Sequence, residues 1–238
     1  MSESLAGKTA IVTGSSKGIG KAIALSLARS GVKVTLAARH REGLDPAEKE
    51  IRDNGGQCIA VRADISEEAD VARLIETSTK AFGTVDILVN NAGHGIFSKV
   101  ADSSVEEFDG MMKVNLRGVY LCCKAVIPIM TQQKSGAIIN IASLAGKNSF
   151  VGGAIYSATK WGLIGFSRSL MLEVRDSNIR VVSICPGSVN TSFSDHSKDS
   201  EKIIQPQDVA DTVLFALSMP ARSNVSEIDI RPTINPRS

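Results

Sequence analysis

Tyr156 and Lys160 have the residue types and the spacing of a proton-transferring pair. They stand four positions apart in the segment YSATK, so on a helix both side chains would lie on one face. A free tyrosine has a pKa near ~10, and a neighbouring ammonium favours the phenolate and lowers that pKa. The pair is therefore predicted to exchange a proton with a carbonyl or an alcohol. Taken alone, the spacing also fits a surface tyrosine beside a solvated lysine.

A glycine-rich turn near the amino terminus is predicted to bind a dinucleotide. An apolar segment, 9–13, leads into Gly14, Gly18 and Gly20, and a helical pattern opens at Ile19. Glycines allow close approach to a phosphate, and a helix amino terminus offers N–H donors. The spacing departs from the G-x-G-x-x-G fingerprint, so the prediction depends on the strand before the turn and the helix after it. An ordinary strand-to-helix turn is the alternative.

Six segments taken together resemble the short-chain dehydrogenase/reductase family. They match it in residue identity, order and approximate spacing, and the resemblance covers roughly residues 5–235. Ser143 stands 13 positions before Tyr156, which is the usual interval in that family. The segments are TGSSKGIG (13–20), NNAG (90–93), Asn115, Ser143, YSATK (156–160) and PG (186–187).

The resemblance implies a catalytic role for four residues. Tyr156 would protonate the substrate oxygen as hydride arrives at carbon, and Lys160 would lower the pKa of Tyr156 and hold the nicotinamide ribose. Ser143 would polarise the carbonyl. Asn115 would organise a helix break and a water that links Lys160 to solvent. Without the family, Ser143 also fits a strand-end cap and Asn115 a satisfied polar residue of a helix.

The residues after the second predicted strand favour NADP(H) as the cofactor. In a dinucleotide fold, an acid at this place binds the ribose 2′-hydroxyl, whereas a basic residue accommodates a 2′-phosphate. Ala38 occupies the position where NAD-dependent relatives carry Asp, and Arg39 follows it. Lys17 adds a second cation, and arginine suits bidentate phosphate contact. Alternatively, Arg39, His40 and Arg41 form a solvated turn.

The other predicted cofactor contacts come from the resemblance. Asp64 would contact the adenine, although it also fits a helix N-cap. Asn90 would line the adenine ribose or, alternatively, stabilise the central strand, and Thr191 would bind the carboxamide. The predicted cofactor set is Gly14, Ser16, Lys17, Gly18, Ile19, Gly20, Arg39, Asp64, Ile65, Asn91, Ala92, Gly93, Tyr156, Lys160, Pro186, Gly187, Val189 and Thr191.

Apolar strand-like runs alternate with amphipathic helical runs, as in a parallel α/β sheet covered on both faces. We expect one Rossmann-type domain over residues 1–238, with a doubly wound sheet of about seven strands. The predicted strands lie near 8–13, 33–38, 57–63, 86–90, 137–142, 180–185 and 227–231. The predicted helices lie near 18–30, 42–54, 66–82, 103–133 with a break near Asn115, 154–176 and 207–218.

The polar segment 188–206 is long for a loop in a compact domain. The resemblance implies that it closes over the substrate as a lid. Lys147 would either pair with a substrate carboxylate or be a solvated loop residue. The residues expected to face a pocket of mixed polarity are His94, Leu144, Lys147, Phe150, Val151 and Phe193.

The carboxyl-terminal segment 217–233 bears on the substrate because it lacks the glycine pair usual in 3-oxoacyl-carrier-protein reductases. Together with 156–170, it resembles NADP-dependent 3-hydroxy acid dehydrogenases. Segments 113–130 and 136–146 also resemble the carrier-protein reductases. We expect carbonyl/alcohol interconversion on a small 3-hydroxy acid, with a 3-oxoacyl reductase as the alternative. A non-catalytic NADP-binding sensor is the alternative from another class of protein.

Composition and charge point to an ordinary globular protein. Hydrophobic residues make up 43% of the 238 positions, and the net charge of +2 gives no argument for nucleic acid or an anionic membrane. No apolar run approaches the ~20 residues of a membrane span, and no secretory signal is visible. We expect a cytoplasmic protein without a metal site, because its four cysteines lack metal-ligand spacing.

Helices 103–133 and 154–176 are apolar around most of their circumference, and a helix must bury such an extra face. In members of the family that the chain resembles, these helices form a two-fold interface and the last strand forms a second one. We therefore expect a homotetramer.

Overall fold

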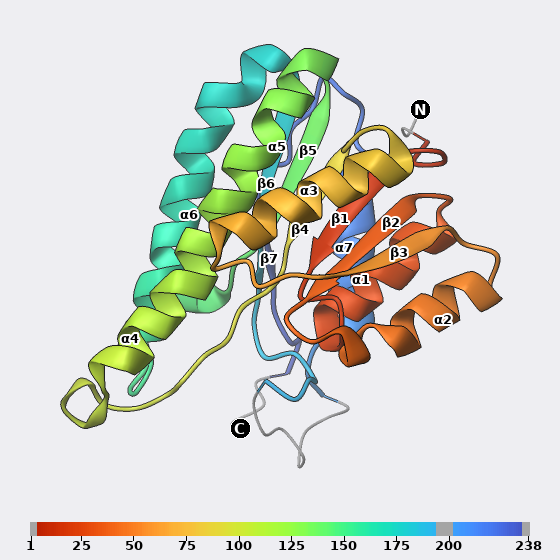
Figure 1. Cartoon of the computed structure of the whole chain (residues 1–238). Helices are drawn as coiled ribbons and strands as arrows, with labels where there is room; N and C mark the ends of the chain where they lie inside the picture. Colours follow the sequence, from red (N-terminus) through yellow and green to blue (C-terminus); the bar gives the residue numbers. More distant parts are fainter. Residues whose placement is uncertain (1–3, 194–201, 235–238) are drawn as a thin grey trace.

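The structure, a computed structural model, describes residues 4–193 and 202–234. Over these residues the chain forms one sheet with helices on both faces (Figure 1). The strand order is β3-β2-β1-β4-β5-β6-β7, and every neighbouring pair is parallel. The predicted fold class, a doubly wound Rossmann-type sheet of about seven strands, is confirmed.

Each predicted strand is present in the described part of the chain, with ends within one residue of the prediction. The central strands are buried on both faces, which explains why they read as continuous apolar runs rather than alternating ones. The strands are β1 (Thr9–Thr13), β2 (Lys33–Ala38), β3 (Cys58–Arg62), β4 (Ile87–Asn90), β5 (Gly136–Ile141), β6 (Ile179–Pro186) and β7 (Glu227–Ile230).

The helices are α1 (Gly18–Arg29), α2 (Asp45–Asp53), α3 (Glu68–Phe82), α4 (Val105–Met112), α5 (Val119–Gln133), α6 (Ala154–Val174) and α7 (Pro206–Ser218). The prediction that a helix starts near residue 42 was wrong. Arg41–Gly43 form a separate 3-10 turn, and α2 begins only where Pro46 occupies its first turn.

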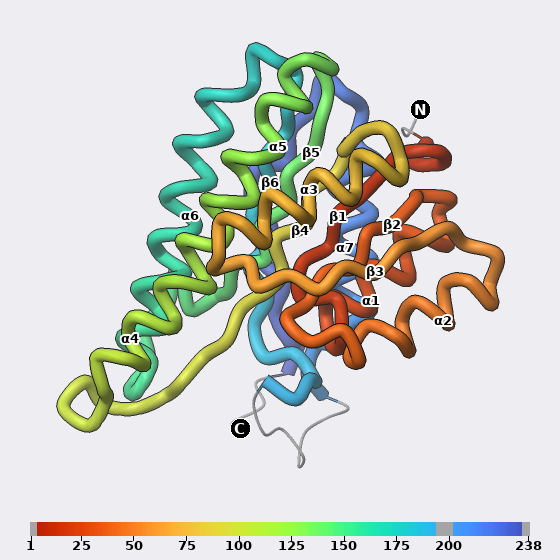
Figure 2. Tube along the Cα trace, in the orientation of Figure 1, coloured from red at the N-terminus to blue at the C-terminus, as the bar shows by residue number. Residues whose placement is uncertain are grey.

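The two faces of the sheet carry two separate apolar cores (Figures 1 and 2). Helices α1, α2 and α7 cover one face, where Leu27, Ile51 and Val213 pack against the sheet. Helices α3, α5 and α6 cover the other face, where Leu74 and Val126 are buried. Because both faces are covered, the exposed edge at the carboxyl ends of the strands is where a ligand can approach.

The predicted break near Asn115 is confirmed. A π-helical turn, Lys113–Gly118, separates α4 from α5 without ending the helical path. Such wider turns are found mostly at functional sites. Here the turn contains Asn115, which is only 1% exposed.

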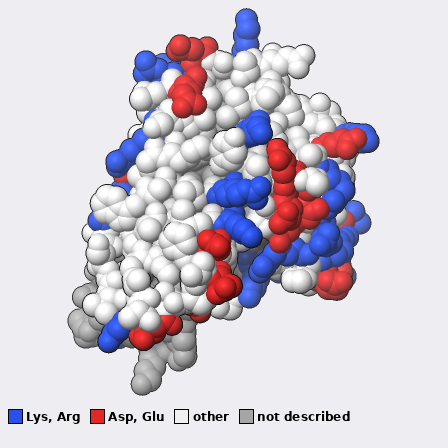
Figure 3. Space-filling view, turned by 60° about the vertical axis from the view of Figure 1, so that its left-hand side comes forward, with Lys and Arg blue, Asp and Glu red and all other residues white. Residues whose placement is uncertain are grey.

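The outer face of α5 and α6 carries large apolar side chains in contact with solvent. Tyr120 on α5 is 47% exposed, and Trp161 and Leu172 on α6 are 54% and 57% exposed. Figure 3 brings this side of the molecule forward and shows few charged residues across most of it. We call these three side chains the outer helical face. Exposed apolar side chains mark an interaction site where they form a contiguous patch.

By length and composition alone, the stretch Val105–Gln133, which contains α4 and α5, is apolar enough to cross a membrane. Its inner side belongs to the core, since Cys122, Val126 and Met130 are buried against the sheet. Core helices of globular domains satisfy the same two criteria.

Candidate active site

The predicted site residues come together at the carboxyl edge of the sheet, the lower edge in Figure 1. The chain runs outward from β1 through β2 to β3 and then returns to place β4 on the other side of β1. Ligands of open α/β sheets bind at such a reversal of strand order. The turn after β1, the loop after β4 and the segments after β5 and β6 all leave the sheet here.

The three glycines of the turn after β1 are required by backbone geometry. Gly14 and Gly18 have φ values of +65° and +56°, which favour glycine. A Cβ on Gly14 would lie 2.7 Å from the Cα of Ala92, and one on Gly20 would lie 2.3 Å from the Gly14 carbonyl oxygen. Asn91 holds the turn in place, because its Nδ2 donates to the carbonyl oxygens of Thr13 (3.0 Å) and Gly14 (3.1 Å).

The amino terminus of α1 is suited to bind an anion. Its N-cap residue, Lys17, makes no side-chain capping bond, and its first turn contains no acidic residue. The N–H groups of Gly18, Ile19 and Gly20 are therefore left to face the turn, at the positive end of the helix dipole. This geometry fits the phosphates of a dinucleotide.

The loop after β2 lies against the glycine-rich turn. A Cβ on Gly43 would lie 3.1 Å from the Cβ of Ser16. Arg39 and Lys17 are both exposed, and among the described residues neither of them forms an ion pair. Arg41, by contrast, pairs with Asp45 and Glu48, which both belong to α2. Within the described residues, Arg39 and Lys17 are thus two cations without an ion-pair partner, one in the loop after β2 and one in the glycine-rich turn.

Asn90 departs from its predicted role at the cofactor, whereas the adenine contact of Asp64 stays a prediction. The carboxylate of Asp64 accepts from the backbone N–H and the hydroxyl of Ser66 (2.9 and 2.8 Å), so it caps its own turn at the end of β3. Asn90 donates to Asn140 Oδ1 (2.8 Å), and Asn140 donates to Ser167 Oγ (2.8 Å). The interpretation of Asn90 as a ribose contact was wrong, and its strand-stabilising alternative is confirmed. Ile65 is likewise buried, packed against Gly118.

Asn115 joins the loop after β4 to α6. Its Oδ1 accepts from the His94 N–H (3.0 Å), and its Nδ2 donates to the His94 carbonyl (2.8 Å) and to Thr159 Oγ1 (3.2 Å). A Cβ on Gly93 would lie 3.1 Å from Asn115 Oδ1. Sequence reasoning missed Thr159, which is fully buried, although it stands inside the YSATK segment beside Lys160.

Ser143 and Tyr156 meet between β5 and α6. The Ser143 hydroxyl accepts from the Ala145 N–H (3.1 Å), so it caps the 3-10 turn Leu144–Gly146, as its alternative interpretation proposed. Tyr156 is 8% exposed. Burial raises the pKa of Tyr156 to about 12, while a hydrogen bond with Ser143 acts in the opposite direction. The predicted lowering of the Tyr156 pKa was wrong for the protein alone, because loss of water around the phenol outweighs the hydrogen bond with Ser143.

Lys160 lies on the same face of α6 as Tyr156, as the spacing predicted. Its Nζ donates to the Ile141 carbonyl (2.9 Å) and lies 5.8 Å from the centre of the Tyr156 ring. Burial lowers the pKa of Lys160 to about 8, with the Cys185 thiol acting in the opposite direction. A buried ammonium beside a phenol stabilises the phenolate once that phenol has given up its proton.

The segments after β6 close the other side of the site. A Cβ on Gly187 would lie 3.2 Å from Leu144 Cδ1, and one on Gly18 would lie 3.3 Å from Thr191 Cγ2. Pro186 ends β6 beside Ile230 of β7. Val189, predicted to contact the cofactor, has its side chain in the core, so only its backbone can make that contact.

The predicted lid 188–206 is fixed at its base. Val189 and Ile204 form a β-bridge, and the Asn190 N–H donates to the Ile204 carbonyl (2.8 Å). Residues 194–201 of the predicted lid lie outside the described residues.

The residues expected to form the substrate pocket divide into two groups. Phe193 contacts the Tyr156 ring, and so does Phe97, which sequence reasoning missed, whereas Phe150 contacts Phe97. Lys147 forms ion pairs with Glu227 and Asp229, so it is neither a solvated lysine nor a cation available to a substrate. Val151 is 89% exposed. No pattern in the sequence singles out Phe97, because its role depends on how three loops meet.

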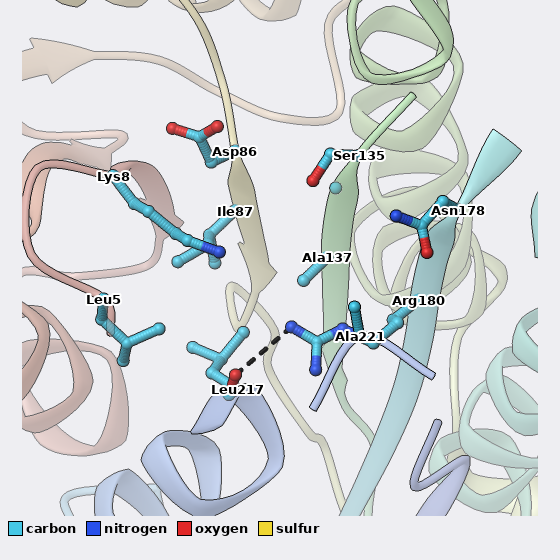
Figure 4. A pocket seen from close by; sticks show the side chains of 11 residues that line it. Leu5, Lys8, Asp86, Ile87, Ser135, Ala137, Asn178, Arg180, Leu217 and Ala221 are labelled. Atoms are coloured by element: carbon cyan, nitrogen blue, oxygen red, sulfur yellow. Dashed lines mark hydrogen bonds between the residues drawn. The ribbon is translucent and has the colours of Figure 1, made fainter. Parts of the chain in front are cut away.

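A separate pocket of about 110 Å³ lies at the opposite, amino edge of the sheet (Figure 4). Lys8, Asp86 and Arg180 line it, and Arg180 donates to the carbonyls of Leu217 and Met219 at the end of α7. No predicted site residue contributes to this pocket. Within residues 4–193 and 202–234, no group of three or more His, Cys, Asp or Glu side chains could hold a metal ion.

Replacing Lys160 with Met should stabilise the protein near neutral pH. The pKa of Lys160 falls from 10.5 to about 8 on folding, so the unfolded chain binds more protons between these values and wild-type stability rises with pH there. We expect Lys160→Met to raise the free energy of unfolding by about 3.5 kcal/mol at pH 7, the fall of the pKa from 10.5 to about 8 being worth ~1.4 kcal/mol per pKa unit. The gain should vanish near pH 10.5 in urea titrations. A less stable variant at pH 7 would contradict this account.

Comparison with known proteins identifies the family. Residues 8–202 match the family model described as short chain dehydrogenase. The chain is 38% identical over 229 residues to a protein of Staphylococcus aureus (strain MRSA252) named uncharacterized oxidoreductase, covering 96% of this chain and 98% of that one.

Two solved structures share the fold over nearly all of both chains. One is a metagenomic short-chain oxidoreductase in complex with NADP, with a TM-score of 0.87 and 39% identity, covering 98% of this chain and 100% of that one. The other is an alcohol dehydrogenase from the archaeon Thermococcus sibiricus complexed with 5-hydroxy-NADP, with a TM-score of 0.89, 30% identity and coverage of 95% and 97%. The chain therefore belongs to the short-chain dehydrogenase/reductase family and is an oxidoreductase.

Proposed function

We propose that the protein is an NADP(H)-dependent oxidoreductase that interconverts a carbonyl and an alcohol, with Tyr156 as its general acid and base. The observation that carries the proposal is the buried Tyr156 phenol, with Ser143 as its hydrogen-bond partner and Lys160 beside it. This group stands at the edge of the sheet that also holds the glycine-rich turn. The two solved relatives in complex with NADP or 5-hydroxy-NADP support the choice of cofactor.

The residues around the glycine-rich turn fit a dinucleotide phosphate. The open amino terminus of α1 would hold the pyrophosphate, and Arg39 and Lys17 would hold the 2′-phosphate. When bound, the reduced nicotinamide supplies the hydride, and the protein supplies orientation and proton transfer.

The protonation states suit Tyr156 as the acid for carbonyl reduction. With a pKa of about 12, its phenol keeps its proton at neutral pH and donates it to the carbonyl oxygen. The Ser143 hydroxyl hydrogen-bonds the same oxygen, and the Lys160 ammonium offsets the charge left on the phenolate. Alcohol oxidation uses the same groups in reverse, with the phenolate as the base.

Asn115 acts in this proposal by positioning. Its bonds to His94 and Thr159 fix the start of α6, and therefore Lys160, relative to the loop after β4. We also propose that it helps to hold a water that connects Lys160 to solvent, the role that the family resemblance implies.

The substrate hypothesis drawn from the sequence was a small 3-hydroxy acid, with a 3-oxoacyl thioester as the alternative. The ion pairs of Lys147 with Glu227 and Asp229 remove the side chain that was the candidate partner for a substrate carboxylate. The site therefore supports the proposed carbonyl/alcohol reaction, but Lys147 no longer supports a 3-hydroxy acid as the substrate of that reaction.

We further propose a homotetramer in the cytoplasm. Pairing of two outer helical faces would bury Tyr120, Trp161 and Leu172, and β7 lies at the edge of the sheet, where a second interface can form. The four cysteines are unpaired and buried, which supports a reducing compartment.

Replacing Tyr156 with Phe tests the proposed chemistry. The variant keeps the ring but lacks the transferable proton, so kcat for carbonyl reduction should fall by about 10²–10⁴-fold. Binding of NADPH, followed by fluorescence titration, should change little. Equal turnover by both proteins would remove Tyr156 from the mechanism. Tight NADPH binding without turnover of any carbonyl by the wild type would favour the sensor alternative.

Replacing Arg39 with Ala tests the cofactor assignment. Loss of one charged hydrogen bond to phosphate, about 1.5–3 kcal/mol, should weaken NADPH binding about 10- to 150-fold and leave NADH binding nearly unchanged. Arg41→Ala is the matched control, because Arg41 is already paired with Asp45 and Glu48. Calorimetric titration of both variants with both cofactors makes the comparison. Equal wild-type affinity for NADPH and NADH would contradict the assignment.

Light scattering tests the assembly. The purified protein at micromolar concentration should have four times the chain mass of 25.2 kDa. Leu172→Glu with Trp161→Glu should lower that mass, because two carboxylates cannot be buried in an apolar interface without great cost. A wild-type mass of one chain would refute the proposal.

A further inference from the structure

Three phenylalanine rings from three separate loops form a connected cluster beside Tyr156, in which Phe97 and Phe193 contact the Tyr156 ring and Phe150 contacts Phe97. Phe97 comes from the loop between β4 and α4, Phe150 from the loop before α6, and Phe193 from the segment after β6. The Phe97 ring centre lies 5.4 Å from that of Tyr156, 5.8 Å from that of Phe150 and 6.2 Å from that of Phe193. The centres of Phe193 and Tyr156 are 5.7 Å apart. We call Phe97, Phe150 and Phe193 the phenyl wall.

The phenyl wall is open to solvent on one side. Phe97, Phe150 and Phe193 are 45%, 37% and 41% exposed, whereas the Tyr156 beneath them is 8% exposed. Rings whose only purpose was to fill the core would be covered on all sides. Partly exposed rings next to a reacting group are what an apolar ligand covers when it binds.

Glycines in the same loops make room for these rings. A Cβ on Gly95 would lie 2.9 Å from Phe193 Cζ and 3.0 Å from Phe97 Cζ. A Cβ on Gly153 would lie 2.3 Å from Phe150 Cζ. The backbone of two loops is therefore compatible with the phenyl wall only because it has no side chain at these points.

Two basic side chains of the described part of the site, Lys147 and His94, do not offer a partner for an anionic substrate. Lys147 is held by Glu227 and Asp229. Burial, with a contribution from Arg39, lowers the pKa of His94, which keeps its imidazole neutral at pH 7. The backbone of His94 is moreover bound on both sides by Asn115.

From this arrangement we infer that the enzyme acts on carbonyl compounds with an aryl or similarly bulky apolar group next to the reacting carbon. The inference rests on the carbonyl/alcohol chemistry proposed above for Tyr156. The carbonyl oxygen would face Tyr156 and Ser143, and the apolar group would lie against the phenyl wall. Hydride from NADPH goes to the carbonyl carbon and the proton of Tyr156 to the oxygen, which gives the secondary alcohol and NADP⁺.

The test compares three ketones of increasing polarity with NADPH as the reductant: acetophenone, 2-butanone and acetoacetate. We expect kcat/KM for acetophenone to exceed the other two values by at least about 10-fold, since it alone covers the phenyl wall. Phe97→Ala should lower kcat/KM for acetophenone about 10- to 100-fold and that for 2-butanone less than about 3-fold. For Phe97→Leu, which keeps an apolar side chain, kcat/KM for acetophenone should lie between the values of the wild type and of Phe97→Ala.

Two controls separate loss of the wall from loss of the fold. Phe215→Ala removes a ring from α7 that is 54% exposed and should leave all three kcat/KM values unchanged. NADPH affinity and the melting temperature report on the folding of each variant, and Phe97→Leu serves if Phe97→Ala does not fold.

The outcomes distinguish this inference from the proposed function. Preference for acetoacetate, or for acetoacetyl thioesters, with activity that still depends on Tyr156, would overturn the substrate class and leave the chemistry standing. An equal loss of kcat/KM for acetophenone and 2-butanone in both Phe97 variants would overturn the role of the wall. Absence of turnover with every carbonyl, together with no effect of Tyr156→Phe, would overturn the proposed function itself.

Discussion

The side-chain amide of Asn115 makes the contacts on which the geometry of the site depends. It binds both backbone groups of His94 and the hydroxyl of Thr159, so one buried group connects the loop after β4, the π-turn before α5 and the start of α6. An ordinary α-helical path offers little room for such a side chain to turn inward, and the wider turn at Lys113–Gly118 provides it. The position of Lys160, one residue after Thr159, follows from these bonds.

Burial changes the pKa of both Tyr156 and Lys160 on α6, and it also lowers the stability of the fold. Water is removed from both Tyr156 and Lys160, which raises the pKa of the phenol and lowers that of the ammonium. At neutral pH the Tyr156 phenol is therefore uncharged, whereas Lys160, with a pKa of about 8, is still mostly an ammonium. In that state Tyr156 is a proton donor, and the nearby lysine becomes most useful when the phenol ionises. Active sites commonly retain such unfavourable burial because function requires it.

The sequence was sufficient to predict the fold and the positions of most site residues, because strand periodicity and glycine spacing are local properties. The strand ends fell within one residue, and Gly14, Ser143 and Tyr156 were placed correctly at the carboxyl edge. The errors concerned properties that depend on contacts between distant segments. The inward turn of Asn90 depends on a neighbour 50 positions away, and the ion pairs of Lys147 on neighbours 80 and 82 positions away. The pKa of Tyr156 depends on how deeply the fold buries its phenol. The role of Phe97 could not be predicted for the same reason.

The buried hydrogen bonds from Asn90 through Asn140 to Ser167 determine how β4, β5 and α6 are aligned with one another. They connect β4, β5 and α6, and a shift of β5 by one residue would turn Asn140 to the other face and leave its partners unsatisfied. They also fix the position of α6 along its own axis relative to the sheet, since Ser167 lies two helical turns beyond Lys160. A slip of α6 by one turn, about 5.4 Å, would carry Tyr156 away from Ser143. These buried hydrogen bonds therefore fix the register of α6 relative to β5, which keeps Tyr156 next to Ser143.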